Sequence, residues 1–214
     1  MVIPSRLAEY IVAAMIIILA PGPSVLFVIA RAIAWGRKVA VFTVGGNVTG
    51  AFFLSTFVAF GLGPILQNSD IAYIAVQWGG GLYLMYLGFD AIKHRKIHAA
   101  DMTNQGDREP SALRSMRDGF WVGALNPKGL VFYAAVLPQF IDRDKGQVTS
   151  QLILLGAIFS ALAFISDGSW GLLAGTARAW LANDSTRLEK LRAAGGSIMI
   201  VLGLSVLFFA IVSG

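Results

Sequence analysis

Long hydrophobic stretches separated by short polar segments make up most of this chain. Six stretches are almost free of charged residues, at about 7–30, 39–62, 71–92, 119–141, 151–175 and 194–213. Each is about 20 residues or longer, which is the length that an α-helix needs to cross roughly 30 Å of hydrocarbon. The pattern therefore predicts an all-α polytopic membrane protein with six transmembrane helices.

The longest polar segment divides the predicted helices into two sets of three. We predict a single transmembrane domain over residues 1–214, with a first half at 1–92, a cytoplasmic linker at 93–118 and a second half at 119–214. A run that begins at Pro23 in the first stretch is echoed by a run that begins at Pro127 in the fourth. Because each half has an odd number of helices, equivalent helices would run in opposite directions, which is the 3+3 inverted repeat of many transporters.

Composition and charge agree with a protein of the cell inner membrane. Charged residues are 14% of the chain, against about 25% in soluble proteins. The net charge of +5 comes from loop residues, so a lipid bilayer rather than nucleic acid is the expected partner. Thirteen Lys and Arg fall on one side of the predicted helices and three on the other, with Lys128 counted on neither. The positive-inside rule then places both termini outside the cytoplasm.

The first hydrophobic stretch is interrupted by Ala20-Pro21-Gly22-Pro23-Ser24. Two prolines remove two backbone donors, and within hydrocarbon the carbonyls that they free need partners from protein, water or a ligand. A broken helix offers half-helix ends and bare carbonyls to a bound solute. The alternative is a structural kink whose carbonyls are satisfied by a neighbouring Ser or Asn. The interruption also indicates a retained helix rather than a cleaved signal peptide.

A second break is predicted at Leu125-Asn126-Pro127-Lys128-Gly129. A lysine within a transmembrane helix costs roughly 2.5–3.5 kcal/mol and normally faces protein or water. The alternative is that Lys128 snorkels to the membrane surface. Both predicted breaks lie toward the cytoplasmic end of their stretches, whereas an inverted repeat would mirror them. An earlier start to the fourth helix would reconcile the two.

Asp167 is the only acidic residue well inside a predicted helix, and such residues are functional candidates. A carboxylate there can bind a proton or a cation in one state and release it in another, or it can form a structural ion pair with Lys128. Asn47 can bind a substrate or hydrogen-bond to a neighbouring helix. Glycines at 79, 80, 81 and 88 favour close helix packing instead of chemistry.

Other classes of function fit the sequence less well. The chain has no cysteine, and no Ser-His-Asp set can be assembled within the stretches, so an enzyme is disfavoured. One deep acid without His, Cys or Glu disfavours a metal-cation exporter, and we expect neither a metal site nor a cofactor. A membrane scaffold would not need two broken helices. Association into a homo-oligomer stays open.

Several of these motifs resemble those of the LysE/RhtB amino-acid exporters. The resemblance implies export of a small amino acid or a related zwitterion, with a proton as the coupling ion. It also implies roles for Asp167 and Trp170, because family members often carry an aspartate and a tryptophan in the fifth helix. Many members have an acid in the second helix where this chain has Asn47, which disfavours a strongly cationic substrate such as lysine. The resemblance rests on the doubled proline with Ala30-Arg31 and Gly36-Arg37, and on Gly119-Phe120, Leu125-Asn126-Pro127-Lys128 and Leu137-Pro138-Gln139-Phe140.

We therefore expect a secondary transporter whose site lies between the first, second, fourth and fifth helices. The positive end of a half-helix suits a carboxylate, with help from Lys128, while bare carbonyls or Asp167 suit an ammonium. The candidate residues for substrate binding or coupling are Pro21, Gly22, Pro23, Ser24, Asn47, Asn126, Pro127, Lys128, Asp167 and Trp170.

Overall fold

The computed structural model describes residues 3–96, 109–177, 179–180 and 183–212, which form eight α-helices and no strand. The all-α prediction is confirmed for these residues, whereas 97–108 of the predicted linker lie outside them. A π-helical turn at Phe132–Val136 and a 3-10 turn at Leu137–Phe140 continue α7, and a further 3-10 turn lies at Arg143–Lys145. The helices are α1 Leu7–Leu19, α2 Pro23–Trp35, α3 Arg37–Asn68, α4 Asp70–Lys93, α6 Ala112–Ala124, α7 Pro127–Val131, α8 Val148–Thr176 and α10 Ser185–Val212.

Both predicted helix breaks are present. The axes of α1 and α2 meet at 49°, and α6 meets the helix from Pro127 to Phe140 at 42°. Pro23 and Pro127 each stand at the start of the helix after the break, where a missing N–H costs no helical hydrogen bond. Because α6 already begins at Ala112, within the predicted linker, 13 helical residues precede each break. With this earlier start, the second break no longer lies close to the beginning of its helix, and each break follows a half-helix of the same length.

Length and apolarity identify three to five candidate membrane spans in the described residues. Arg37–Gly61, Val148–Thr176 and Thr186–Phe208 qualify alone, and the two bent pairs qualify if each counts as one span. With 24 residues, α4 is long enough, but Gln77 and the three glycines that follow Trp78 lower its mean hydropathy. By these criteria α4 is not a candidate span, so the prediction of a sixth transmembrane helix is not confirmed.

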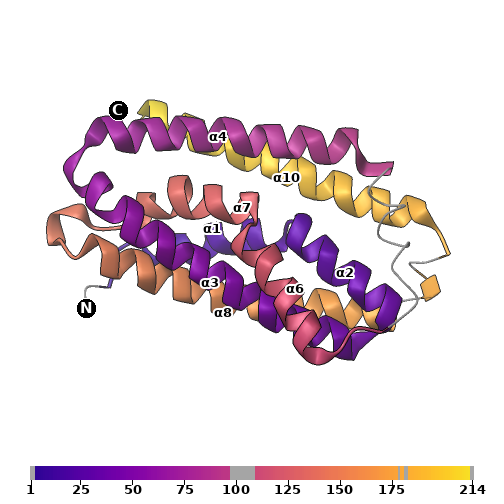
Figure 1. Ribbon diagram of the computed structural model, residues 1–214. Helices are drawn as coiled ribbons and strands as arrows, with labels where there is room; N and C mark the ends of the chain where they lie inside the picture. Colours follow the sequence, from indigo (N-terminus) through magenta and orange to yellow (C-terminus); the bar gives the residue numbers. More distant parts are fainter. Residues whose placement is uncertain (1–2, 97–108, 178, 181–182, 213–214) are drawn as a thin grey trace.

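The helices run roughly parallel or antiparallel to one another in an elongated bundle (Figure 1). One layer contains α3 packed against α6 and α8, and α4 pairs with α10 along the opposite side. The bundle end where α1 begins also carries the turn at Arg143–Lys145 and the end of α10 (Figure 1). There Asp142 accepts hydrogen bonds from Ser5 N at 2.9 Å and Ser5 Oγ at 2.7 Å. Together with the hydrogen bond from Lys145, these contacts lower the pKa of Asp142 to about 2.

Backbone contact between α3 and α6 depends on glycines spaced four residues apart, Gly46 and Gly50 on α3 and Gly119 and Gly123 on α6. A Cβ atom on Gly46 would lie 1.9 Å from the Met116 carbonyl oxygen, and one on Gly50 2.0 Å from the corresponding atom of Phe120. Small residues at this spacing let helix backbones approach closely in membranes.

The predicted close packing of the α4 glycines is confirmed at three of the four positions. A Cβ atom on Gly80 would lie 2.3 Å from Ala135 Cβ, and on α10 one on Gly88 would lie 2.5 Å from the Gly196 carbonyl oxygen and one on Gly81 3.0 Å from that of Gly203. Gly79 has nothing within 4 Å of such an atom, so it takes no part in the packing.

We expect Gly46→Ala to force α3 and α6 apart, with a loss of roughly 1–3 kcal/mol in stability. The matched control is Gly45→Ala, because a Cβ on Gly45 has nothing within 4 Å. Thermal unfolding of the purified proteins in one detergent measures the difference. Equal Tm values for the two variants would contradict this account of the α3–α6 contact.

Candidate functional site

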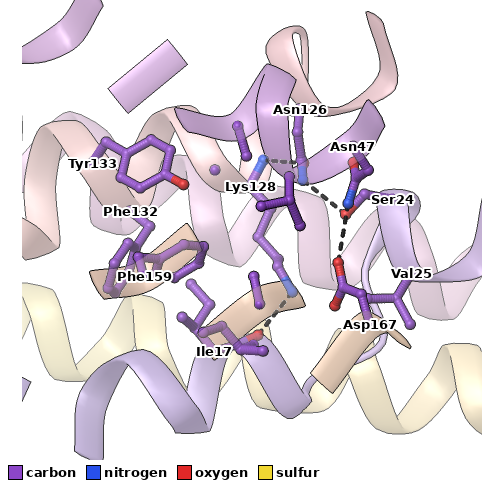
Figure 2. A pocket seen from close by; sticks show the side chains of 16 residues that line it. Ile17, Ser24, Val25, Asn47, Asn126, Lys128, Phe132, Tyr133, Phe159 and Asp167 are labelled. Atoms are coloured by element: carbon purple, nitrogen blue, oxygen red, sulfur yellow. Dashed lines mark hydrogen bonds between the residues drawn. The ribbon is translucent and has the colours of Figure 1, made fainter. Parts of the chain in front are cut away.

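A small cavity lies where the two helix breaks face α3 and α8 (Figure 2). Its volume is about 30 Å³, which is room for one or two water molecules, whereas ligand pockets typically hold about 300–1,000 Å³. The cavity in this conformation is therefore closed around its own side chains. The polar residues that line it are Ser24, Asn47, Asn126, Lys128, Tyr133 and Asp167.

The Lys128 ammonium satisfies the carbonyls that the first helix break leaves free. Its side chain is buried, with 5% of the residue exposed, and Nζ donates to Ile17 O at 2.8 Å and to Ala20 O at 2.7 Å. Pro21 has no N–H to pair with the Ile17 carbonyl, and the backbone at Ala20 is extended, so neither oxygen has its usual helical partner. The alternative of a structural kink expected a neighbouring Ser or Asn to satisfy these carbonyls, and in the structure Lys128 does so instead. The snorkelling alternative is wrong, because the ammonium points into the protein.

Gly22 leaves the space that this lysine fills. A Cβ atom there would lie 3.0 Å from both Cδ and Nζ of Lys128, so the side chain runs directly along bare backbone. An ammonium has three N–H donors, and the third donor of Lys128 finds no acceptor among the described residues. The site thus retains one unused donor beside the cavity.

Asn126 ties the two breaks together. Its Oδ1 caps α7 by accepting from Lys128 N at 3.0 Å, and its Nδ2 donates to Ser24 Oγ at 3.0 Å. The three prolines of the breaks do not line the cavity. Pro21 packs against α10 near Gly195, Pro23 is exposed, and Pro127 is half-buried. They shape the backbone instead of contacting the cavity contents.

Asp167 and Asn47 meet across the cavity from Lys128 (Figure 2). Both are buried, each with 4% of the residue exposed, and Asn47 Nδ2 donates to Asp167 Oδ2 at 3.0 Å. This leaves Asn47 Oδ1 buried without a hydrogen-bond partner in the part of the chain that the structure describes. Asp167 and Lys128 both belong to the described part of the chain, yet no ion pair within 4.0 Å joins them. The ion-pair alternative for Asp167 is therefore not present in this conformation.

Tyr133 is a cavity residue that sequence reasoning missed. Its hydroxyl is buried, has no partner in hydrogen-bond geometry among the described residues although Ser160 lies near it, and faces the cavity (Figure 2). Its ring packs edge-on against Phe159, with ring centroids 5.2 Å apart, and Phe159 in turn lies 4.8 Å from Phe132. A tyrosine within the apolar run after Lys128 is the only sequence signal for it.

Trp170 is not brought into this cavity. It lies one helical turn beyond Asp167 on α8, is half-buried, and lines a separate groove with Leu173. Its predicted role in binding thus lacks a contact in the present conformation. No group of three His, Cys, Asp or Glu within the described ranges is placed to hold a metal ion.

An ion pair between the buried Arg31 and the half-buried Asp118 lies beyond the first break. Arg31 Nη2 and Asp118 Oδ2 are 2.5 Å apart and join α2 to α6. The guanidinium carbon of Arg31 also lies 4.9 Å from the ring centroids of both Phe27 and Trp35. Arg31 appeared in a family-like motif, but nothing in the sequence identified its partner.

The profile of the LysE type translocators matches residues 15–211. This chain belongs to the LysE type translocator family. The match includes both helix breaks and every polar residue that lines the cavity. Proteins of this family are transporters, so the chain is a translocator and not an enzyme.

Three relatives align with most of this translocator. The homoserine/homoserine lactone efflux protein of Salmonella typhimurium is 27% identical over 194 residues, covering 91% of this chain and 92% of that protein. The leucine efflux protein of Enterobacter sp. is 27% identical over 156 residues, or 73% of each chain. The membrane protein YrhP of Bacillus subtilis is 28% identical over 186 residues, covering 84% of this chain and 88% of that protein. No solved structure matches the translocator.

Proposed function

We propose that this translocator exports a small amino acid, or a closely related zwitterion, across the cell inner membrane. The observation that carries the proposal is the buried cavity, in which an ammonium and a carboxylate of the protein face each other without pairing. Buried polar atoms without partners cost free energy unless a ligand or water satisfies them. Asn47 Oδ1 and the Tyr133 hydroxyl are two such atoms in the same cavity. Two relatives are named for the efflux of homoserine and of leucine, which carry the same two charged groups as the proposed substrate.

A bound amino acid would use these groups at its two charged ends. Its ammonium has two sets of acceptors to choose from, Asp167 with the free Asn47 oxygen on one side and the carbonyls of the first break on the other. Its carboxylate has the unused Lys128 donor and the Tyr133 hydroxyl, and it lies near the first turn of α2, whose amides lack helical partners. The apolar cavity residues Val48, Ala51 and Ala163 suit a neutral side chain.

The closed cavity supports an occluded conformation with a barrier on each side. Toward the bundle end that carries the start of α1, the aromatic cluster of Tyr10, Phe132, Phe140 and Phe159 is packed shut. Toward the other end, the Arg31–Asp118 pair joins α2 to α6. Alternating access would open one barrier at a time as one half rocks against the other.

We also infer six membrane-crossing helices in a 3+3 inverted repeat, with α4 as the remaining crossing. Under this symmetry α1–α2 corresponds to α6–α7, α3 to α8, and α4 to α10. The observed packing supports it where α4–α10 and α3–α8 map onto themselves, whereas the extensive α3–α6 contact maps onto a smaller contact between α8 and α1. The matching Pro23 and Pro127, each at the start of its half-helix, support the same correspondence.

Substrate exchange in proteoliposomes tests the proposed function. We expect counterflow of neutral amino acids, including homoserine or leucine, and little counterflow of lysine, because the cavity offers a single acid. Liposomes without protein give the background. Transport of divalent metal ions without exchange of any zwitterion would overturn the proposal.

Labelling of single cysteines tests the orientation, since the chain has no cysteine of its own. Gln147 and Glu109 are both exposed and shortly precede α8 and α6, two helices that begin at opposite ends of the bundle (Figure 1). A cysteine at position 147 should react with an impermeant maleimide on intact cells, whereas one at 109 should react only after permeabilisation. The reverse pattern would place both termini in the cytoplasm.

Asp167→Asn tests whether Asp167 carries a coupling proton. The amide keeps the shape of a protonated acid, so gradient-driven efflux should fall to background while substrate exchange persists. If Asp167 binds the substrate ammonium instead, driven efflux and exchange should weaken together. Asp90→Asn is the control, because Asp90 pairs with His94 at the far end of α4, away from the cavity. Full gradient-driven efflux in Asp167→Asn would exclude both roles.

A further inference from the structure

The two carbonyls that the first break leaves without helical partners are already hydrogen-bonded to a side chain of the protein. Ile17 O and Ala20 O each accept from Lys128 Nζ, at 2.8 Å and 2.7 Å, and no water or substrate is needed to satisfy them. The oxygens belong to the first half of the chain and the ammonium to the second. This pair of carbonyls thus binds a primary ammonium.

An amino acid carries the same group on its α-carbon. The cavity of about 30 Å³ is too small to take an amino acid beside Lys128, and the lysine side chain itself forms part of the wall. The lysine side chain also has more rotatable bonds than any other side chain that lines the cavity. Gly22 presents no side chain that would hold the ammonium in place.

We propose that the Ile17 and Ala20 carbonyls form a primary-ammonium site, which Lys128 occupies in the empty translocator and the α-ammonium of the substrate takes over during transport. The inference rests on the proposed function, because it assigns a place to the substrate's amino group. Lys128 then competes with the substrate for the two carbonyls, and its side chain moves away from them each time a substrate molecule binds.

Lys128 has partners after it leaves the carbonyls. The substrate carboxylate arrives with the ammonium that displaces it, and Asp167 lines the same cavity with only one of its oxygens hydrogen-bonded. Exchange of one ammonium for another leaves neither the carbonyls nor the lysine unpaired, which avoids the cost of an isolated buried charge. The empty protein likewise keeps its break satisfied.

The first test uses Lys128→Ala and propylammonium, which matches the atoms deleted beyond Cβ. In detergent, saturating propylammonium chloride should raise the Tm of this variant by about 5 °C. Tetramethylammonium chloride, which has no N–H, and sodium chloride should not. Wild type and Lys38→Ala, which removes an exposed lysine, should not respond to any of the three salts. No specific effect of propylammonium, or an equal effect of sodium, would overturn the ammonium site.

The second test asks whether substrate and propylammonium compete. In Lys128→Ala, propylammonium should raise the Kd of the amino acid that wild type exchanges in proportion to the propylammonium concentration. A Kd that is unchanged by propylammonium would overturn the takeover and leave Lys128 a structural residue. If wild type exchanges no amino acid, the proposed function fails, while the first test still reports on the carbonyl site because it uses no amino acid.

A folding defect in Lys128→Ala does not block these tests. Purification with propylammonium present throughout should rescue the variant if the site is as proposed, and sodium chloride should not. Lys128→Gln provides a second variant, because its amide supplies N–H donors without the charge and is a weaker competitor. In this variant propylammonium should raise the Kd of the amino acid more than it does in wild type, and a Kd that does not depend on propylammonium would overturn the inference.

Discussion

The hydrogen bonds from the Lys128 ammonium to the Ile17 and Ala20 carbonyls make each half of the chain depend on the other. A helix broken by two prolines exposes carbonyls that hydrocarbon cannot satisfy. A lysine at the same depth is costly unless it finds acceptors. The two unfavourable features remove each other's cost when they meet. The Pro-Gly-Pro and Asn-Pro-Lys motifs are therefore one structural unit, although about a hundred residues separate them.

The remainder of the site is positioned by the contact between α3 and α6. A Cβ on Gly123 would lie 2.0 Å from the Asn47 carbonyl oxygen, so the backbone that carries Asn47 is held directly against α6. From there Asn47 reaches Asp167 on α8, while α6 leads into Asn126 and the second break. A small displacement between these two helices would separate the amide from the carboxylate. Glycine packing thus fixes the polar geometry without contributing a polar atom.

The sequence predicted the individual polar residues better than it predicted their partners. Lys128, Asp167 and Asn47 stand out because a membrane penalises each of them, and both helix breaks follow from proline chemistry. What Lys128 binds could not be predicted, because a carbonyl has no sequence signature and Ile17 looks like any other apolar position. Arg114 and Arg117 are typical of an interfacial helix over residues 111–118, and the sequence did not show that this helix continues into the fourth stretch as α6. Tyr133 and the Arg31–Asp118 pair depend on tertiary contacts in the same way.

The balance of charge in the cavity accounts for the kind of solute that it suits. Lys128 and Asp167 contribute one formal charge of each sign, and a zwitterion adds none, so its burial leaves the sum unchanged. A substrate with a cationic side chain would add a positive charge that needs a second acid. The residue best placed to supply one is Asn47, whose amide instead donates to Asp167. A carboxylate there would repel Asp167 in the empty protein unless a cation lay between them. The asparagine therefore stabilises the lone acid without a bound cation, which supports the proposal that the transported solute is a neutral amino acid.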